Sequence, residues 1–290
     1  MRMDYFIHLA NFVGFAAILA LSLNLVVGYT GLLSFAHAAF YAIGAYTTAI
    51  LTVRYDFPFF VGFLGGMALA MLFAAALGPI LSRFRGDYYA LGSLGVTVIA
   101  TSILMNWESL TNGPLGITGI PRPSFFGHPF ITPREYLLFT GVIVALVYGC
   151  SALITRSSFG RALQAIREDE DALKVFGYKT NQYKLMIFVL SAGLASIAGT
   201  LFASYLLSID PTSFTMGESV AVLSMIIVGG LANHRGALLG AAVITLLPEL
   251  LRLIGLPSVH EAQLRQAVYG LLLTLLMLYR PQGWIGKYSL

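Results

Sequence analysis

The sequence predicts an all-α polytopic membrane protein with about eight to ten transmembrane helices, some of them broken by glycine. Hydrophobic residues make up 58% of the 290 residues and charged residues only 10%, whereas a soluble domain carries about 25% charged residues. The mean hydropathy is +0.81, and apolar runs of roughly 20 residues, long enough to cross a bilayer, recur along the chain. The 30 glycines suit closely packed or interrupted membrane helices. We therefore expect a single transmembrane domain over residues 1–290.

Five apolar runs predict spans in the first part of the chain. They are Phe6–Val27, Ala38–Val53, Phe59–Leu81, Tyr88–Asn106 and Leu137–Ile154. Between the first two, residues 28–37 (GYTGLLSFAH) contain two glycines and a cluster of hydroxyls that break the helix at membrane depth. Such backbone is tolerated only where protein or a water-filled cavity covers it. Between the last two, the loop 108–135 holds five prolines and four glycines, which favour turns over helix.

Four further apolar runs follow in the second part of the chain. They are Leu185–Leu207, Glu218–Leu231, Ala237–Leu253 and Glu261–Tyr279. Lys and Arg concentrate on cytoplasmic loops, so we expect the polar segment 155–184 to be cytoplasmic and the loop 108–135 to be external. Nine spans then place the N terminus outside. The basic residues at helix ends orient the protein in the bilayer, and they do not indicate nucleic-acid binding.

The polar segment 155–184 is the only long polar stretch, with six of the 17 basic and four of the 13 acidic residues. As one helix over Gly160–Gly177, it carries a stripe of Leu163, Ile166, Leu173 and Phe176, which the acidic run 168–171 interrupts. Gly177 suits a left-handed end to this helix, and the next residues predict a new helix capped by Thr180. Two interpretations remain open from the residues: a helix that docks on a partner, or a solvated connector.

Two glycine-interrupted segments provide candidates for a transport pathway, because paired broken helices often mark the centre of a transporter. Tight helix packing explains each glycine equally well, and the spacings in the two segments differ. The candidates are Gly28, Gly31, Ser34 and His37 in the first half, and Glu218, Gly229 and Gly230 in the second.

Catalytic and metal-binding motifs are absent from the sequence. It has no phosphate-binding loop, no H-E-x-x-H, one cysteine, and five histidines that lie far apart in the predicted topology. We therefore expect no catalytic residue, metal or cofactor in this chain. Intramembrane ionisable groups are also few, whereas ion-driven carriers often use them. This favours an energy source outside the chain.

Four blocks of sequence carry a family resemblance. The stretch GRALQAIREDEDALKVFGYKTNQYKLMIFVLSAGLASIAGTL resembles the ATPase-contacting loop of ABC importer permeases, in particular the branched-chain amino acid permease family of the LivM type. The resemblance recurs at LSLNLVVGYTGLLSFAHAAFYAIGAY, TNGPLGITGIPRP and VGGLANHRGALLGAAVITLLPELLR. In order, the blocks cover most of Leu21–Arg252.

The resemblance implies a multi-pass permease of the bacterial inner membrane that imports leucine, isoleucine, valine or related small substrates. It implies a second related permease, two cytoplasmic ATPase subunits that bind ATP and magnesium, and a periplasmic substrate-binding protein. The helix at 156–184 would contact the ATPase. The candidate contacts are Arg161, Ile166, Arg167, Glu168, Glu170, Leu173, Phe176 and Gly177.

Two alternatives accompany this resemblance. The acidic run EDED is denser than the family's usual Glu-x-Glu pattern, so Glu168 and Glu170 both remain candidates for the ATPase-contacting carboxylate. A self-contained secondary carrier or channel for a small solute is the alternative function, and in it the polar segment would be a solvated connector.

Overall fold

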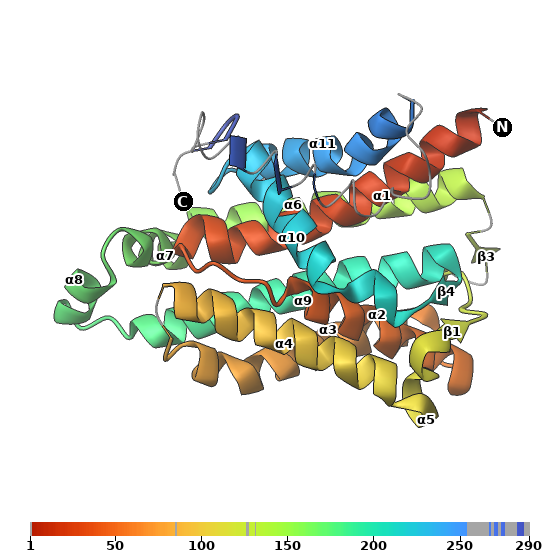
Figure 1. Cartoon of the computed structure of the whole chain (residues 1–290), viewed down its shortest axis with the longest axis horizontal. Coiled ribbons are helices and arrows are strands. Elements are labelled where there is room, and N and C mark those ends of the chain that lie inside the picture. The colour runs from red at the N-terminus through yellow and green to blue at the C-terminus, as the bar shows by residue number, and fades with distance from the viewer. Residues whose placement is uncertain are drawn as a thin grey trace.

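Helices that run in alternating directions build most of the chain. The computed structural model describes residues 2–84, 86–125, 128–130 and 132–253, together with residues 267, 270–271, 274–275 and 283–286. The long helices are α1 (Arg2–Leu23), α2 (His37–Arg54), α3 (Phe59–Leu81), α4 (Asp87–Asn106), α6 (Pro133–Arg156), α9 (Thr180–Leu206), α10 (Met216–Gly229) and α11 (His234–Leu253). This arrangement confirms the predicted all-α polytopic class (Figure 1).

Short elements gather at the two opposite ends of the bundle (Figure 1). At one end lie α5 (Glu108–Thr111) and four two-residue strands: β1 (Ile117–Thr118), β2 (Ser124–Phe125), β3 (His128–Pro129) and β4 (Ser208–Ile209). Strand β1 pairs antiparallel with β4, and β2 pairs with β3. At the other end lie α7 (Ser158–Glu168) and α8 (Glu170–Val175). We call these the β end and the α7 end; α1 begins at the β end and runs toward the α7 end.

Five helices among the described residues are long and apolar enough to cross a membrane. They are Asp4–Gly28, Phe59–Leu81, Asp87–Asn106, Pro133–Arg156 and Thr180–Leu206. The apolar helix α10 has 14 residues and is about 21 Å long, shorter than the roughly 30 Å hydrocarbon core. The predicted last span, Glu261–Tyr279, lies almost entirely outside the described residues.

The centre of the bundle is formed by α1, α2 and α9. A Cβ on Gly44 of α2 would lie 2.0 Å from the carbonyl oxygen of Ser196 on α9, so the two backbones touch. The Thr48 hydroxyl donates to that of Thr200 across the same contact, at 2.9 Å. Close backbone approach and interhelical hydrogen bonds hold membrane helices together, because lipid is as apolar as the side chains it competes with.

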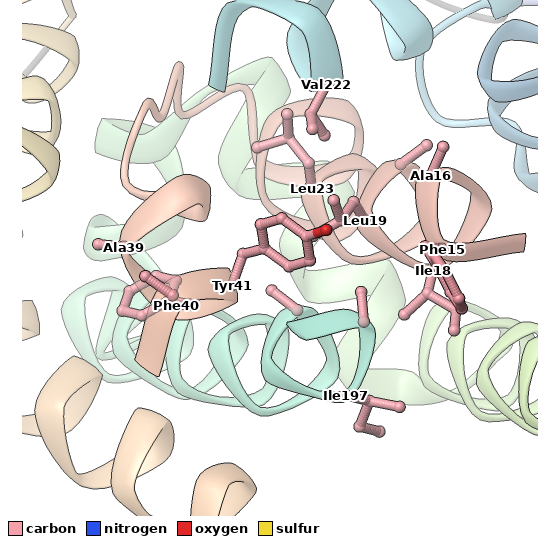
Figure 2. Packing of buried hydrophobic residues seen from close by; sticks show 14 of the residues in the cluster. Phe15, Ala16, Ile18, Leu19, Leu23, Ala39, Phe40, Tyr41, Ile197 and Val222 are labelled. Carbon is pink, nitrogen blue, oxygen red and sulfur yellow. The ribbon is translucent and has the colours of Figure 1, made fainter. Parts of the chain in front are cut away.

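Aromatic and aliphatic side chains fill the space between these central helices. Figure 2 shows the ring of Tyr41, on α2, lying beside Leu19 and Leu23 of α1, with Val222 of α10 nearby. The outer helices instead turn large apolar side chains outward, as at Leu72, Leu91 and Leu146 on α3, α4 and α6. An apolar outer surface around a packed interior is the arrangement expected in a bilayer.

Candidate functional site

The break predicted after the first span is present, and residues 31–35 are not helical. Helix α1 passes into a π-helix, Asn24–Gly28, and α2 begins at His37. Gly31 has a backbone φ of +72°, a conformation that residues with a Cβ atom rarely adopt. π-Helical turns are rare, so this segment departs from regular helix even before the non-helical residues begin.

Hydroxyl side chains from two helices satisfy the backbone of the broken segment. The Phe35 amide donates to Ser93 Oγ at 2.9 Å, and Thr97 Oγ1 donates to the Phe35 carbonyl at 2.6 Å. From α10, Ser219 Oγ donates to the same carbonyl at 2.6 Å and accepts from the Ala38 amide at 3.1 Å. These bonds explain how irregular backbone is tolerated at membrane depth.

Three of the pathway candidates lie in or beside the broken segment: Ser34 is part of it, His37 begins α2 after it, and Glu218 precedes Ser219, which binds it. Ser34 and His37 are fully buried. His37 Nε2 lies 2.9 Å from Ser191 Oγ on α9, and that hydroxyl donates to the Ser22 carbonyl of α1 at 2.7 Å. Glu218 is partly buried in the first turn of α10. The helices α1, α2 and α9 are therefore tied together at His37.

The second glycine-broken segment is the turn between α10 and α11. A Cβ on Gly229 would lie 1.9 Å from the Gly236 carbonyl oxygen, and Gly230 has φ +113°. The amides of Trp284 and Ile285 donate to the last two carbonyls of α10, each at 3.1 Å. A turn near the end of the chain thus caps α10, and no local motif in the sequence signals this contact.

The two broken segments touch each other at the α7 end. Asn24 Oδ1 accepts a hydrogen bond from the Ala232 amide at 3.0 Å. The ring of Tyr29 stacks on His234 with centroids 5.4 Å apart, and Thr155 Oγ1 of α6 lies 2.9 Å from His234 Nε2. The two glycine-interrupted segments, whose internal symmetry in the sequence is weak, therefore form one contact region.

The polar segment forms two helices, so the prediction of one helix over Gly160–Gly177 was wrong. Ser157 caps α7 by accepting from the Gly160 amide at 3.3 Å. At Asp169 the chain turns to extended backbone, and Asp169 Oδ1 accepts from the amides of Asp171 and Ala172. An aspartate is a strong N-cap, so the acidic run starts a second helix rather than only interrupting a stripe.

The end of α8 confirms one predicted cap and corrects another. Gly177 has φ +84°, its amide donates to the Lys174 carbonyl, and the Tyr178 amide donates to the Leu173 carbonyl. This is the Schellman arrangement expected of a terminal glycine. Thr180, however, does not cap α9; its hydroxyl donates to Glu170 Oε1 at 3.0 Å instead.

The predicted apolar stripe is divided between the inside and the outside of the protein. Leu163 is fully buried and packs in one cluster with Leu25, Ile187 and Ala232. Ile166 is only 6% exposed, so it faces the bundle and not a partner, contrary to the sequence prediction. Phe176, by contrast, is 80% exposed. The break at Asp169 gives the two helices different orientations, which the single-helix pattern does not allow.

The two candidate carboxylates have different surroundings. Glu170 Oε1 lies 3.0 Å from Lys174 Nζ and 2.9 Å from the buried Lys184 Nζ. Burial alone would raise the pKa of Glu170, but the hydrogen bonds from Lys184, Lys174 and Thr180, together with the charge of Lys184, lower it to about 2. Glu168 is exposed. Glu168 is therefore the carboxylate open to a partner, while Glu170 holds α8 on α9.

Arg167 lies on the inner side of α7 and reaches the first broken segment. Its Nη1 donates to the Val27 carbonyl at 3.0 Å and also to the Gly28 carbonyl. Its side-chain stem covers Gly31, where an added Cβ would lie 3.1 Å from Arg167 Cγ. Arg161, six residues earlier, is exposed. We call the contact of Arg167 and Leu163 with residues 24–31 and 232–234 the α7 junction.

A family model described as the permease component of branched-chain amino acid transport systems matches residues 5–278. The chain belongs to this family. The resemblance stated from the sequence is confirmed, and the chain is a multi-pass membrane permease component.

Named relatives of the permease come from bacteria and an archaeon. The high-affinity branched-chain amino acid transport system permease protein LivM of Escherichia coli K12 is 36% identical over 92% of this chain and 66% of its own length. The probable permease LivM of Methanocaldococcus jannaschii is 25% identical, over 94% of this chain and 91% of its own. The high-affinity branched-chain amino acid transport system permease protein LivH of Escherichia coli K12 is 25% identical, over 93% of this chain and 91% of its own length. The permease thus spans just under two thirds of the length of its Escherichia coli LivM relative. No solved structure matches it.

Several residues of the site were missed by sequence reasoning. In the permease, Ser93, Thr97 and Ser219 form hydrogen bonds with the backbone of the broken segment at Phe35. Asn24 connects the two broken segments by its hydrogen bond with Ala232. Ser93 and Thr97 lie four residues apart on a predicted span, a spacing that places both hydroxyls on one helix face. That signal was available in the sequence. In the described part of the chain, no group of three or more His, Cys, Asp or Glu could hold a metal ion.

Proposed function

We propose that the permease is the transmembrane subunit of an ATP-driven importer whose cargo is a branched-chain amino acid or a related small substrate. It forms the translocation pathway with a second related permease in the bacterial inner membrane. Two ATPase subunits on the cytoplasmic side bind ATP and magnesium, and a periplasmic binding protein delivers the substrate. The names of the relatives, which are permease proteins of branched-chain amino acid transport systems, support the substrate class.

The observation that carries this proposal is the surface of α7 and α8. These helices project from the bundle at the α7 end (Figure 1). Val175, the last residue of α8, and Phe176, directly after it, are 86% and 80% exposed. The exposed carboxylates Glu168 and Asp171 lie close to them in the sequence. Large apolar side chains at full exposure beside charges are typical of an interaction surface. A partner with an apolar groove and basic residues at its rim fits this surface.

The contacts proposed for the ATPase therefore differ from the set expected from sequence. Arg161, Glu168 and Phe176 face outward and stay in the proposal, and Val175 joins them. The partly buried Leu173 and the cap at Gly177 set the position of α8. Ile166, Arg167 and Glu170 face the protein and support the docking surface from behind.

The opposite end of the molecule is the proposed entrance for substrate. Strand β1 of the long loop pairs with β4, which precedes the Asp210–Pro211 turn, with Ile117 opposite Ile209. This pairing places the segment 112–122 beside β4, directly before the segment 210–218, and we propose that both segments face the binding protein. Substrate would enter there, and movement of α7 and α8 by the ATPases would switch the access of the pathway at the glycine breaks.

Reconstitution tests this function directly. Permease, its paired permease and the ATPases are placed in proteoliposomes with ATP inside, and labelled leucine and binding protein are added outside. We expect uptake that requires both ATP and binding protein. Uptake by permease chains alone, driven by a proton or sodium gradient, would instead support the secondary carrier.

A further inference from the structure

We propose that Arg167 is the positioning residue that transmits movement of α7 to the broken segment at Gly28–Gly31. The inference rests on the proposed function, because an ATPase has to move α7. It goes beyond that function by naming the contact through which docking reaches the pathway. The observations that carry it are the bonds of Arg167 to the π-helix, the packing of its stem on Gly31, and its place next to the exposed Glu168.

The guanidinium of Arg167 binds where the helix ends. Val27 and Gly28 are the last two residues of the π-helix, and the helical segment ends at Thr30, so both carbonyls belong to its last turn, where the supply of intrahelical amide donors ends. These carbonyls carry partial negative charge, which a cation stabilises. Arg167 donates to both of them, and the Gly31 amide donates to the Val27 carbonyl as well, at 3.1 Å. A rigid planar guanidinium suits this task better than a flexible ammonium group.

The stem of Arg167 adds a steric link to the same segment. Arg167 Cγ lies over Gly31, at 3.1 Å from the position that a Cβ would take. Because Gly31 has φ +72° and no side chain, the arginine stem can lie directly against the backbone at the start of the non-helical segment. A displacement of Arg167 therefore meets backbone and not a side chain that could rotate away.

The position of Arg167 on α7 connects this contact to the outer surface. Arg167 is the penultimate residue of α7, and Glu168, the next residue, is exposed. Beyond the break at Asp169, α8 is held separately on α9 by the contact of Glu170 with Lys184. The two helices thus lead to different parts of the bundle: α7 to the broken segment and α8 to the start of α9.

A purely structural role for Arg167 makes a different prediction. If Arg167 only fixes α7 in place, its loss disturbs the docking surface, so ATPase binding and uptake fall together. If Arg167 transmits movement, the ATPases still bind and hydrolyse ATP while uptake fails. The ratio of substrate transported to ATP hydrolysed separates the two roles.

The test compares Arg167→Met with the parent and with Lys179→Met. Methionine keeps an apolar stem and removes the guanidinium; Lys179 is an exposed cation in the same polar segment, so its change to methionine is the matched control. We expect unchanged ATPase co-purification in both variants. We expect substrate transported per ATP to fall about tenfold or more in Arg167→Met, because the charged hydrogen bonds to the Val27 and Gly28 carbonyls are lost; tenfold corresponds to about 1.4 kcal/mol. Lys179→Met should match the parent.

A second variant covers the case in which Arg167→Met does not reach the membrane. Arg167→Gln keeps an N–H donor for the carbonyls but loses the positive charge and the planar set of guanidinium donors. We expect the same fall in substrate transported per ATP hydrolysed. A parent-like ratio of substrate transported to ATP hydrolysed in either variant overturns the inference. A loss of ATPase binding that matches the loss of uptake overturns it as well. If the parent shows no ATP-driven uptake at all, the proposed function fails and the inference fails with it.

Discussion

Lys184 is a buried cation that, in the part of the chain that the structure describes, pairs with the partly exposed carboxylate of Glu170. Its side chain is 4% exposed and that of Glu170 is 22% exposed, with 2.9 Å between Nζ and Oε1. A buried charge is costly when its partner is removed, whereas an exposed ion pair contributes little. At the scale of single residues, this asymmetry predicts which carboxylate of the acidic run holds α8.

Removing the Glu170 carboxylate should loosen α8 from α9. Glu170→Gln leaves Lys184 buried without a counter-charge, and we expect a cost of about 1–3 kcal/mol in local stability. Asp171→Asn is the control, since Asp171 is 70% exposed and pairs with the same Lys174; it should cost at most about 0.5 kcal/mol. Amide hydrogen exchange of residues 170–176 measures both. Equal protection in the two variants would argue against the role given to Glu170.

Acid should release the same contact. The pKa of Glu170 is lowered from 4.5 to about 2, so the folded protein binds this proton less readily than the unfolded chain does. Its contribution to stability is therefore complete above pH 4.5 and is lost as the pH falls toward 2. We expect the protection of α8, corrected for intrinsic exchange, to stay constant from pH 7 to 5 and to fall below pH 4.5. Glu170→Gln should lack this transition, and a transition that persists in the variant belongs to another group.

At the level of secondary-structure elements, the main features are two interrupted helical segments and a polar segment divided into α7 and α8. The π-helix and residues 31–35 meet the turn between α10 and α11, and Leu163 and Arg167 connect α7 to both. Helices that contain such breaks can change shape at a few residues while the rest of the bundle stays packed. The α7 junction therefore joins the two broken segments to α7, and in the function we propose these are the parts that switch the access of the pathway.

A large side chain at Gly31 should stop transport without preventing insertion. Leucine in the left-handed conformation costs about 1–3 kcal/mol and would also displace Arg167. Gly31→Leu should lose uptake at a normal membrane level. Gly141→Leu on α6 is the control, because a Cβ at Gly141 meets nothing within 4 Å. Normal uptake by Gly31→Leu would leave Gly31 as a packing residue only.

The fold class was predictable from the sequence because length and apolarity alone identify membrane helices. The breaks at Gly28 and Gly31 were predictable as well, since glycine and hydroxyl clusters mark them. The contacts across the bundle were not, because the bond of Asn24 to Ala232 joins residues 208 positions apart. Asp169 misled the single-helix prediction, since periodicity reports which face is apolar and not where a cap side chain turns inward to bind backbone amides.

The whole molecule has two different ends, and we predict that the α7 end is cytoplasmic and the β end external. Single cysteines test this orientation on a Cys150→Ala background. Exposed Ser158, at the start of α7, should be labelled as Ser158→Cys only from the cytoplasmic side. Exposed Thr118, in β1, should be labelled as Thr118→Cys from outside in intact cells. Labelling of Ser158→Cys from outside would reverse the topology.

The central claim is that α7 and α8 dock on an ATPase, and co-purification tests it most directly. The double variant Val175→Ala with Phe176→Ala removes the two exposed apolar side chains at the C-terminal end of α8. Truncating a well-buried anchor costs about 2 kcal/mol or more, roughly thirtyfold in affinity. Leu138→Ala with Leu146→Ala, two exposed side chains on α6, is the control. We expect the α8 variant to insert normally but to lose most of the co-purified ATPase per permease, while the α6 variant retains it. Full retention of ATPase together with normal uptake in the α8 variant would contradict the docking surface and leave α7 and α8 as a solvated connector.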